Sequence, residues 1–240
     1  MPRSRKRALT PFPLYCGTSG FSYKEWKGPF YPEKLPAGEM LAYYGSRLPA
    51  VEINNTFYRL PNEALIDGWR EQVPETFRFA VKMSRRITHV KRLADCEEEA
   101  SRFFRVVARL EHRLGVALIQ LPPHFRIDVE RLKRFLGLVP ADIPAAFEFR
   151  HASWQDEAVL GTLKEHGAAW VHVDDAGASP SDVPRPATWI YLRLRAPAYS
   201  VEALRAWRQL CLGFDRAYVF FKHEDEGIGP ALAERMLTLE

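Results

Sequence analysis

The chain has 240 residues, of which 47% are hydrophobic and 27% are charged, and these values fit one large α/β domain or two small ones. The formal net charge is +4, and four cations lie within the first seven residues, so the remainder is close to neutral. A near-neutral body argues against extensive binding along a nucleic-acid backbone. We expect residues 1–13 to form a disordered basic leader and residues 14–240 to form a single domain.

The three cysteines are widely spaced and match neither a metal pattern such as C-x-x-C nor a disulfide framework, which favours a reducing compartment. No apolar run approaches the roughly 20 residues that span a bilayer. Residues 9–13 contain two prolines instead of the apolar stretch of a secretory signal. The sequence therefore predicts a cytoplasmic protein without a membrane partner, and it leaves the oligomeric state open.

Eight short segments have the composition of β-strands, and most of them show period-two alternation. The first runs into a tight loop at residues 17–20, and the second alternates apolar residues with Glu52 and Asn54. The expected strands are residues 14–16, 50–54, 77–82, 115–121, 146–150, 170–174, 189–194 and 217–221.

Apolar residues at helical spacing fill most of the intervals between these strands. Their starts carry capping patterns. The expected caps are Asn62, Asp128, Ser153 and Ser200, together with a capping box from Asp95 to Glu98. Two further helices are expected at residues 39–47 and 230–239, and the helix that begins near Ser153 is expected to end at Gly167. Residues 176–187 are rich in Pro, Ser and Gly, so we expect an irregular connection between strands six and seven.

Alternation of strand and helix implies a parallel sheet, and eight such units in about 240 residues match an α/β fold of the (β/α)8 TIM-like barrel type. A doubly wound open sheet is the alternative. The barrel is favoured because many strands carry polar residues on one face, whereas a sheet covered on both sides is apolar on both.

Polar side chains gather at the carboxyl ends of the predicted strands, which meet at one mouth of a barrel. They are Glu52, Asn54, Lys82, Gln120, Glu148, Arg150, His172, Asp174, Tyr191, Arg193 and Lys222. Buried charges are tolerated only when they are paired, so such a ring is costly. It marks either an active site or a network that satisfies itself and fixes the register of the barrel.

Four of these side chains are the candidate catalytic groups, namely Glu52, Glu148, His172 and Asp174. Carboxylates and an imidazole transfer protons, and two carboxylates at one mouth suggest a glycosidase-like pair. The same four groups have suitable donor atoms for a divalent metal, but neighbouring cations would compete for the acids. We therefore predict no metal and no other cofactor, with a divalent metal as the alternative.

The candidate ligand contacts are led by Lys82, Arg150 and Arg193, whose charges suit a phosphate or a carboxylate. The loop at residues 17–20 offers amides and hydroxyls that would cradle an anion. Nearby aromatic rings would stack on a ligand, and two histidines lie just past strand ends. The other predicted contacts are Thr18, Ser19, Tyr23, Asn54, Tyr58, His89, Gln120, His151, Trp154, Tyr191 and Lys222.

Several local motifs run in a fixed order along residues 14–225. They are Gly17 to Tyr23 with Trp26, residues 30–32, residues 52–59, Lys82 with Thr88 and His89, residues 120–123, and residues 148–151 with Trp154. In these motifs the chain resembles the domain of unknown function 72 family, also called YecE-like proteins. The resemblance implies a TIM-barrel-like fold and no particular activity.

The ring residues predict a metal-independent enzyme that acts on a small polar ligand, expected to be anionic, by general acid/base chemistry at the barrel mouth. The alternative is a protein that binds nucleic acid or a nucleotide, or a metal-assisted phosphoesterase like the barrel endonucleases. The aromatic and basic loop at residues 21–31 and the pair Arg85-Arg86 motivate that alternative.

Overall fold

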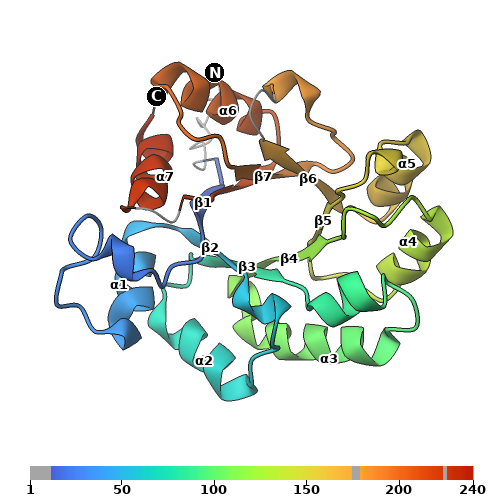
Figure 1. Ribbon diagram of the computed structural model, residues 1–240, viewed down its shortest axis with the longest axis horizontal. Helices are drawn as coiled ribbons and strands as arrows, with labels where there is room; N and C mark the ends of the chain where they lie inside the picture. The colour runs from blue at the N-terminus through green and yellow to red at the C-terminus, as the bar shows by residue number, and fades with distance from the viewer. Residues whose placement is uncertain (1–11, 175–178, 224–225, 240) are drawn as a thin grey trace, which may run out of the picture.

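The computed structural model describes residues 12–174, 179–223 and 226–239, and it shows eight parallel strands closed into a barrel in sequence order, with helices around it (Figure 1). The strands are β1 (Leu14–Ser19), β2 (Ala50–Ile53), β3 (Arg78–Lys82), β4 (Leu114–Gln120), β5 (Ala145–Glu148), β6 (Ala169–Asp174), β7 (Trp189–Leu194) and β8 (Arg216–Phe221). The α-helices are α1 (Met40–Arg47), α2 (Glu63–Gln72), α3 (Glu97–Val107), α4 (Val129–Leu136), α5 (Glu157–Glu165), α6 (Val201–Cys211) and α7 (Ile228–Thr238).

Pairing of β1 with β8, from Leu14 opposite Ala217 to Thr18 opposite Phe221, closes the sheet. This closure confirms the predicted barrel and excludes the open sheet. The predicted leader falls mostly on residues 1–11, which lie outside the described residues. Within the described ranges, no helix is both long enough and apolar enough to cross a bilayer.

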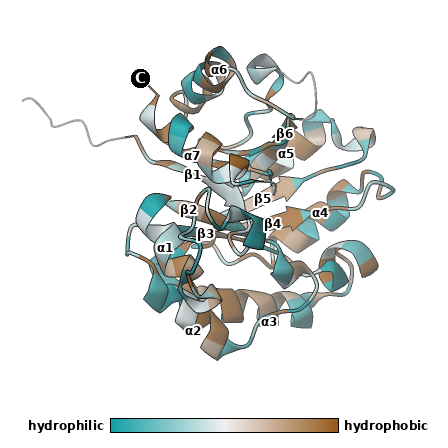
Figure 2. Ribbon diagram, turned by 60° about the vertical axis from the view of Figure 1, so that its left-hand side comes forward, coloured by the Kyte–Doolittle hydropathy of each residue, from teal (hydrophilic) through white to brown (hydrophobic). Residues whose placement is uncertain are grey.

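Successive residues of each strand belong to two different cores. Side chains such as Val51 and Phe147 face outward and pack between the strands and the helices. Their neighbours Ala50 and Ala146 face inward and pack inside the barrel. The helices carry hydrophobic and hydrophilic residues side by side, as amphipathic helices do (Figure 2). Each large apolar side chain that is fully buried in this way contributes about 1.5–3 kcal/mol.

Three helix starts are confirmed by their caps. Asn62 accepts a hydrogen bond from the Leu65 N–H at 2.9 Å, and Ser200 accepts one from the Ala203 N–H at 3.1 Å. Asp128 caps α4 in the same way. These side-chain oxygens satisfy amides that have no partner within the helix.

Two other helix starts differ from expectation. Asp156, not Ser153, caps α5, because Ser153 lies in a separate 3₁₀ turn (Ala152–Trp154) that precedes the helix. The expected capping box at Asp95 is absent from α3, which begins at Glu97 without a side-chain cap. Asp95 has φ = 45°, a left-handed conformation that an N-cap residue does not adopt.

Four irregular features shape the carboxyl-end mouth of the barrel. A 3₁₀ turn (Asn55–Phe57) follows β2, and a π-helical turn (Arg86–Val90) that the sequence did not predict follows β3. β5 and β6 pair only through Ala146 and Phe147, so their carboxyl ends separate. The described part of the β6–β7 connection holds a single 3₁₀ turn (Pro180–Asp182), in line with the irregular connection predicted there.

Candidate active site

Polar side chains form the layer of the barrel interior nearest the carboxyl ends of the strands. Each follows an inner-core residue of its own strand at an even spacing, and so points inward. We call this layer the polar ring: Ser19, Glu52, Lys82, Gln120, Glu148, Tyr191 and Arg193. All of its members are buried, and the most exposed, Lys82, keeps 9% of its surface accessible.

Arg193 lies between the two ring carboxylates and binds both. Its Nη2 donates to Glu52 Oε1 at 2.7 Å, and its Nη1 donates to Glu148 Oε2 at 2.5 Å. The three side chains are at most 3% exposed. In a buried triad of this kind the remaining hydrogen-bonding atoms also need partners, and among the atoms of these three side chains Arg193 Nε is buried without one in the described part of the chain.

Both oxygens of Glu52 are occupied. Oε1 also accepts from Ser19 Oγ and from Asn54 Nδ2, and Oε2 accepts from the Tyr191 hydroxyl at 2.7 Å. Burial acts to raise the pKa of the Glu52 carboxyl, but the charge of Arg193 and these donors lower it below its ordinary value. Glu52 is therefore an anion at neutral pH.

Glu148 is held in a similar way. Its Oε1 accepts from Gln120 Nε2 at 2.8 Å and from Arg150 Nε at 2.9 Å. Burial opposes ionisation, but the charges of Arg193 and Arg150 lower the pKa of the Glu148 carboxyl to about 2. Because both carboxylates are ionised and fully bonded, neither is well suited to act as a general acid near neutral pH.

Lys82 differs from the two carboxylates, because its charged group lacks polar partners among the described residues. Its ammonium lies 4.2 Å from the centre of the Phe57 ring, and no hydrogen bond or ion pair reaches it from the described part of the chain. Burial and the charge of Arg193 lower the pKa of Lys82 to about 8, although Glu52 and Glu148 act in the other direction. A fraction of this amine is therefore neutral near physiological pH.

His89 packs on the same aromatic ring. Its ring centre lies 4.8 Å from that of Phe57 in an edge-on arrangement, and its Nδ1 is 2.9 Å from Thr88 Oγ1. Burial and the charge of Lys82 lower the pKa of His89 to about 4. The imidazole is therefore neutral at pH 7, and the predicted contact His89 lies beside Lys82 at the mouth.

Two arginines border the polar ring toward solvent. Arg150, a predicted contact, keeps 37% of its side chain exposed. Arg195 was not predicted, although it continues the period-two series of Tyr191 and Arg193 past the end of β7. Both arginines and Glu148 line a cavity of about 610 Å³ at the point where β5 and β6 separate.

The predicted orientation of His172 and Asp174 is wrong. In β6 the inner core takes Ala169, Val171 and Val173, so the alternate residues face the helices. The His172 ring lies 5.4 Å from that of Trp207 in α6. Asp174 accepts a hydrogen bond from the Tyr199 hydroxyl at 2.8 Å. The four predicted catalytic groups are thus divided between the inside of the barrel and its outside, although His172 also lines the cavity that Glu148, Arg150 and Arg195 line.

Thr18 and Trp154, both predicted ligand contacts, have structural partners. The Thr18 hydroxyl donates to the Gly20 carbonyl at 2.6 Å, and the Thr18 side chain is fully buried. The Trp154 indole donates to the Phe125 carbonyl at 2.7 Å and is also fully buried. Neither side chain is accessible to a ligand.

The predicted anion cradle at residues 17–20 is also contradicted. The Thr18 N–H donates to the Tyr44 hydroxyl at 2.9 Å, and the Gly20 N–H donates to the Glu52 carbonyl at 2.8 Å. These amides support the barrel and are not available to an anion.

Four other predicted contacts lie around the mouth. The Tyr23 hydroxyl donates to the Ser19 carbonyl at 2.7 Å, and His151 Nδ1 accepts from the Ser153 N–H at 3.1 Å. Tyr58 is 75% exposed, and Lys222 is exposed just past the end of β8.

No group of three or more His, Cys, Asp or Glu side chains in residues 12–174, 179–223 and 226–239 is arranged to hold a metal ion. The predicted alternative set does not converge, because Glu52 and Glu148 face Arg193 while His172 and Asp174 face the helix layer. The three cysteines, Cys16, Cys96 and Cys211, are buried and free.

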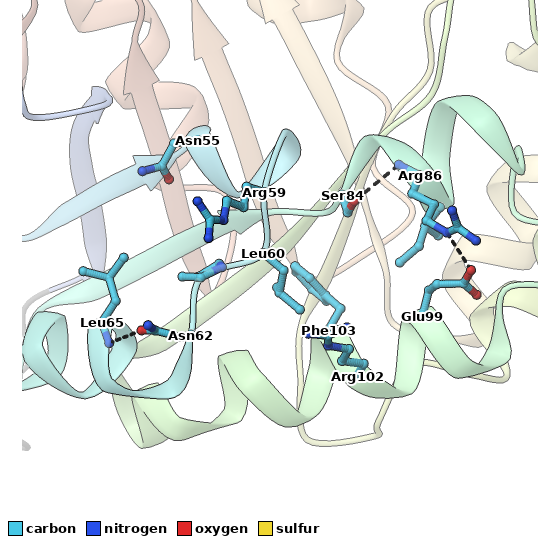
Figure 3. A pocket seen from close by; sticks show the side chains of 12 residues that line it. Asn55, Arg59, Leu60, Asn62, Leu65, Ser84, Arg86, Glu99, Arg102 and Phe103 are labelled. Atoms are coloured by element: carbon cyan, nitrogen blue, oxygen red, sulfur yellow. Dashed lines mark hydrogen bonds and ion pairs between the residues drawn. The ribbon is translucent and has the colours of Figure 1, made fainter.

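A second cavity, of about 840 Å³, lies beside the polar ring and not within it. It is a groove between the loop that follows β2 and helix α3 (Figure 3). Arg59 and Arg102 line it together with the apolar Leu60 and Phe103. Arg86 also lines it, but the Arg86 side chain is paired with Glu99 at 2.8 Å. We refer to this cavity as the arginine groove.

A closed parallel barrel with a buried polar ring at its carboxyl-end mouth belongs to the TIM-barrel class of α/β proteins. The family model described as "Protein of unknown function DUF72" matches residues 15–239. The chain therefore belongs to the DUF72 family, as the motifs predicted.

Curated relatives support this membership. The chain is 30% identical to the UPF0759 protein YunF of Bacillus subtilis (strain 168) over 171 residues, or 66% of this chain. It is 30% identical to the UPF0759 protein YecE of Escherichia coli (strain K12) over 180 residues, or 72% of this chain. The matches span 59% and 62% of the lengths of these two relatives.

Solved structures agree. A DUF72 family protein of Thermotoga maritima MSB8 superimposes with a TM-score of 0.78 at 28% identity, covering 95% of this chain and 100% of the other. A DUF72 family protein of Enterococcus faecalis V583 superimposes with a TM-score of 0.74 at 21% identity, covering 95% and 99%, and supports the fold alone.

Proposed function

We propose that this chain is an enzyme that binds a small anionic ligand, bearing a phosphate or a carboxylate, at the carboxyl-end mouth of its barrel and exchanges a proton with it through Lys82. One observation carries the proposal. The Lys82 side chain is 9% exposed, and its amine has no hydrogen-bond acceptor among the described residues, beside two carboxylates that are already bonded to Arg193.

The balance of charge supports an anionic ligand. Within and above the polar ring there are four cations, Lys82, Arg150, Arg193 and Arg195, and three carboxylates, those of Glu52, Glu148 and Asp182. Arg150 and Arg195 line the cavity at the mouth together with Glu148 and Asp182, and a guanidinium pair suits a phosphate or carboxylate. The ligand would thus supply the negative charge that the site lacks.

The state of the titrating groups supports Lys82 as the group that exchanges the proton. A general base works best when its pKa is near the working pH, and the pKa of Lys82 is lowered to about 8. In this proposal Glu52 and Glu148 stay ionised and hold Arg193 in place. No metal ion is needed, because a lysine and arginines perform both tasks.

A binding screen tests the proposal. We would measure thermal stabilisation by inorganic phosphate, glycerol 3-phosphate, malonate and a panel of sugar phosphates, and follow turnover of each stabilising compound by NMR. Stabilisation is expected for wild type and is expected to be lost in the double variant Arg150→Ala/Arg195→Ala. A matched control, Arg105→Ala/Arg134→Ala, removes two exposed charges from α3 and α4. Equal stabilisation of all three proteins would contradict the proposal.

The second candidate function is binding of a nucleotide or a single nucleic-acid strand, and the arginine groove favours it. Arg59 and Arg102 line the groove, and the neighbouring Tyr58 is exposed for stacking on a base. Binding of an oligonucleotide that weakens steeply with salt and is lost in Arg59→Ala/Arg102→Ala would favour this function. Binding of small anions at the mouth that weakens only gradually with salt and is lost in Arg150→Ala/Arg195→Ala would favour the enzyme.

A further inference from the structure

We propose that Lys82 acts as a covalent nucleophile, forming an imine with the carbonyl group of a small aldehyde or ketone that also bears a carboxylate or phosphate. This inference rests on the proposed function and narrows it, because it names the reactive group of the ligand. Proton exchange alone would not require a carbonyl compound.

The burial of Lys82 is the first support. It is the only buried lysine among the residues that the structure describes, yet 9% of its surface remains accessible. Other lysines have acidic partners or solvent, as Lys91 does with Glu99 at 2.8 Å. A lysine placed inside a barrel mouth without a partner is costly, and functional sites are where such a cost is usually found.

The contact with Phe57 is the second support. The ring lies 4.2 Å from the Lys82 nitrogen, and an aromatic face attracts an ammonium but offers no lone pair for a hydrogen bond. When Lys82 loses its proton, the contact with Phe57 therefore leaves the nitrogen lone pair available to attack a carbonyl carbon. Phe57 also holds the side chain in one position, which favours attack on a bound carbonyl.

The surrounding cations are the third support. Arg193 and Arg150 oppose the charge on Lys82, whereas Glu52 and Glu148, which are bonded to the arginines, favour it. Lysines that form imines are activated by desolvation or by a neighbouring cation, and Lys82 has both. At the mouth, Arg150 and Arg195 would hold the anionic end of the ligand.

Imine formation at Lys82 releases one molecule of water. The neutral amine of Lys82 attacks the carbonyl carbon, forming a C–N bond while the C=O π electrons move to oxygen. Proton transfer from nitrogen to oxygen gives a neutral carbinolamine. The C–O bond then breaks as one further proton, released when the ammonium ionised, joins the departing hydroxyl to form water. The product is a protonated imine, and no oxidant or reductant is consumed.

Reductive trapping with glyoxylate, a small aldehyde that carries a carboxylate, tests the inference. The wild-type protein is incubated with glyoxylate and cyanoborohydride at pH 7.5, and peptide mass mapping locates the carboxymethyl groups formed. We expect Lys82 to be modified at least about tenfold faster than the exposed Lys164 of α5 in the same sample. This comparison is made within one protein, so it does not depend on the folding of a variant.

Two further measurements separate this inference from the proposed function. Lys82→Arg keeps the charge but forms no imine, so the fast modification should disappear. Arg150→Ala/Arg195→Ala should slow modification by glyoxylate several-fold, but not modification by acetaldehyde, which has no charge.

Each outcome decides one of the two proposals. Equal rates at Lys82 and Lys164, with anion stabilisation still dependent on Arg150 and Arg195, would overturn the imine and leave the proposed function intact. Fast modification of Lys82 by both aldehydes, unaffected by the double variant, would support the nucleophile and overturn the anionic ligand.

Discussion

The two sides of the polar ring balance their charges in different ways. On one side, Glu52, Arg193 and Glu148 bind one another and accept or donate hydrogen bonds at nearly every polar atom. On the other side, Lys82 rests on Phe57 with no acceptor among the described residues. Both cations are buried, with 3% of Arg193 and 9% of Lys82 accessible.

This difference distinguishes a network that holds the barrel together from a group that is kept available. A ring that served only to fix the register would be expected to pair both cations, because an unpaired buried charge is costly. We therefore propose that the paired side is structural and that Lys82 is the reactive group. Substitutions on the two sides should change stability in opposite directions.

The largest expected effect is on the paired side. Arg193→Met leaves two buried carboxylates without their common partner, and we expect the free energy of unfolding to fall by about 3–5 kcal/mol. Tyr191→Phe, in the same strand, removes one hydrogen bond to Glu52 and should cost about 1 kcal/mol. Urea denaturation measures both, and a loss from Arg193→Met no greater than that from Tyr191→Phe would show that the triad is not the structural element.

A smaller change of opposite sign is expected at Lys82. The pKa of Lys82 is lowered from 10.5 to about 8, so between these pH values the unfolded chain binds a proton that the folded chain does not, and wild-type stability rises with pH. Below about pH 8 the buried ammonium carries its full cost. Lys82→Met should therefore raise the free energy of unfolding at pH 7 by about 2 kcal/mol.

That gain should fade between about pH 8 and 10.5 as the wild-type amine loses its proton. Lys164→Met, on the exposed face of α5, is the matched control and should change stability little at any pH. Denaturation midpoints measured from pH 6 to 10.5 would decide the matter. Destabilisation by Lys82→Met across this whole range would place Lys82 in the structural network.

The smallest expected effect lies outside the ring. Asp174→Ala removes the acceptor of the Tyr199 hydroxyl and should cost about 1 kcal/mol. Because Asp174 faces the helix layer, the rate at which glyoxylate modifies Lys82 should stay unchanged. A clear drop in that rate, measured at a temperature where the variant is fully folded, would show that Asp174 contributes to the reactive site.

The sequence predicted much of the fold, because alternation in the strands and caps such as Asn62 and Ser200 are local signals. It also predicted the inward-facing acids and cations of β2, β3, β5 and β7. In an alternating strand, one polar residue at the carboxyl end shows which alternate side chains face the barrel interior. In β6 the same reasoning failed. Val171 and Val173 are apolar but face inward, whereas Trp170 is apolar and faces outward, so polarity did not identify the inner face.

The sequence could not predict which charged side chains of the polar ring pair with one another. That Arg193 binds both carboxylates, and leaves Lys82 to Phe57, depends on distances across the barrel. Phe57 lies in a 3₁₀ turn and His89 in a π-helical turn, where strand periodicity no longer applies. Arg195 could have been predicted from the sequence, because it continues the period-two pattern of β7 two residues beyond Arg193.

The most direct test of the account is the titration of the Lys82 amine itself, followed by NMR of the ¹⁵N-labelled side chain, with the resonance assigned by its absence in Lys82→Arg. We predict a midpoint near pH 8, well below the ordinary value of 10.5. A midpoint at or above pH 10.5 would mean that the folded protein stabilises the protonated form of Lys82. That result would contradict both the proton exchange and the imine proposed for this lysine.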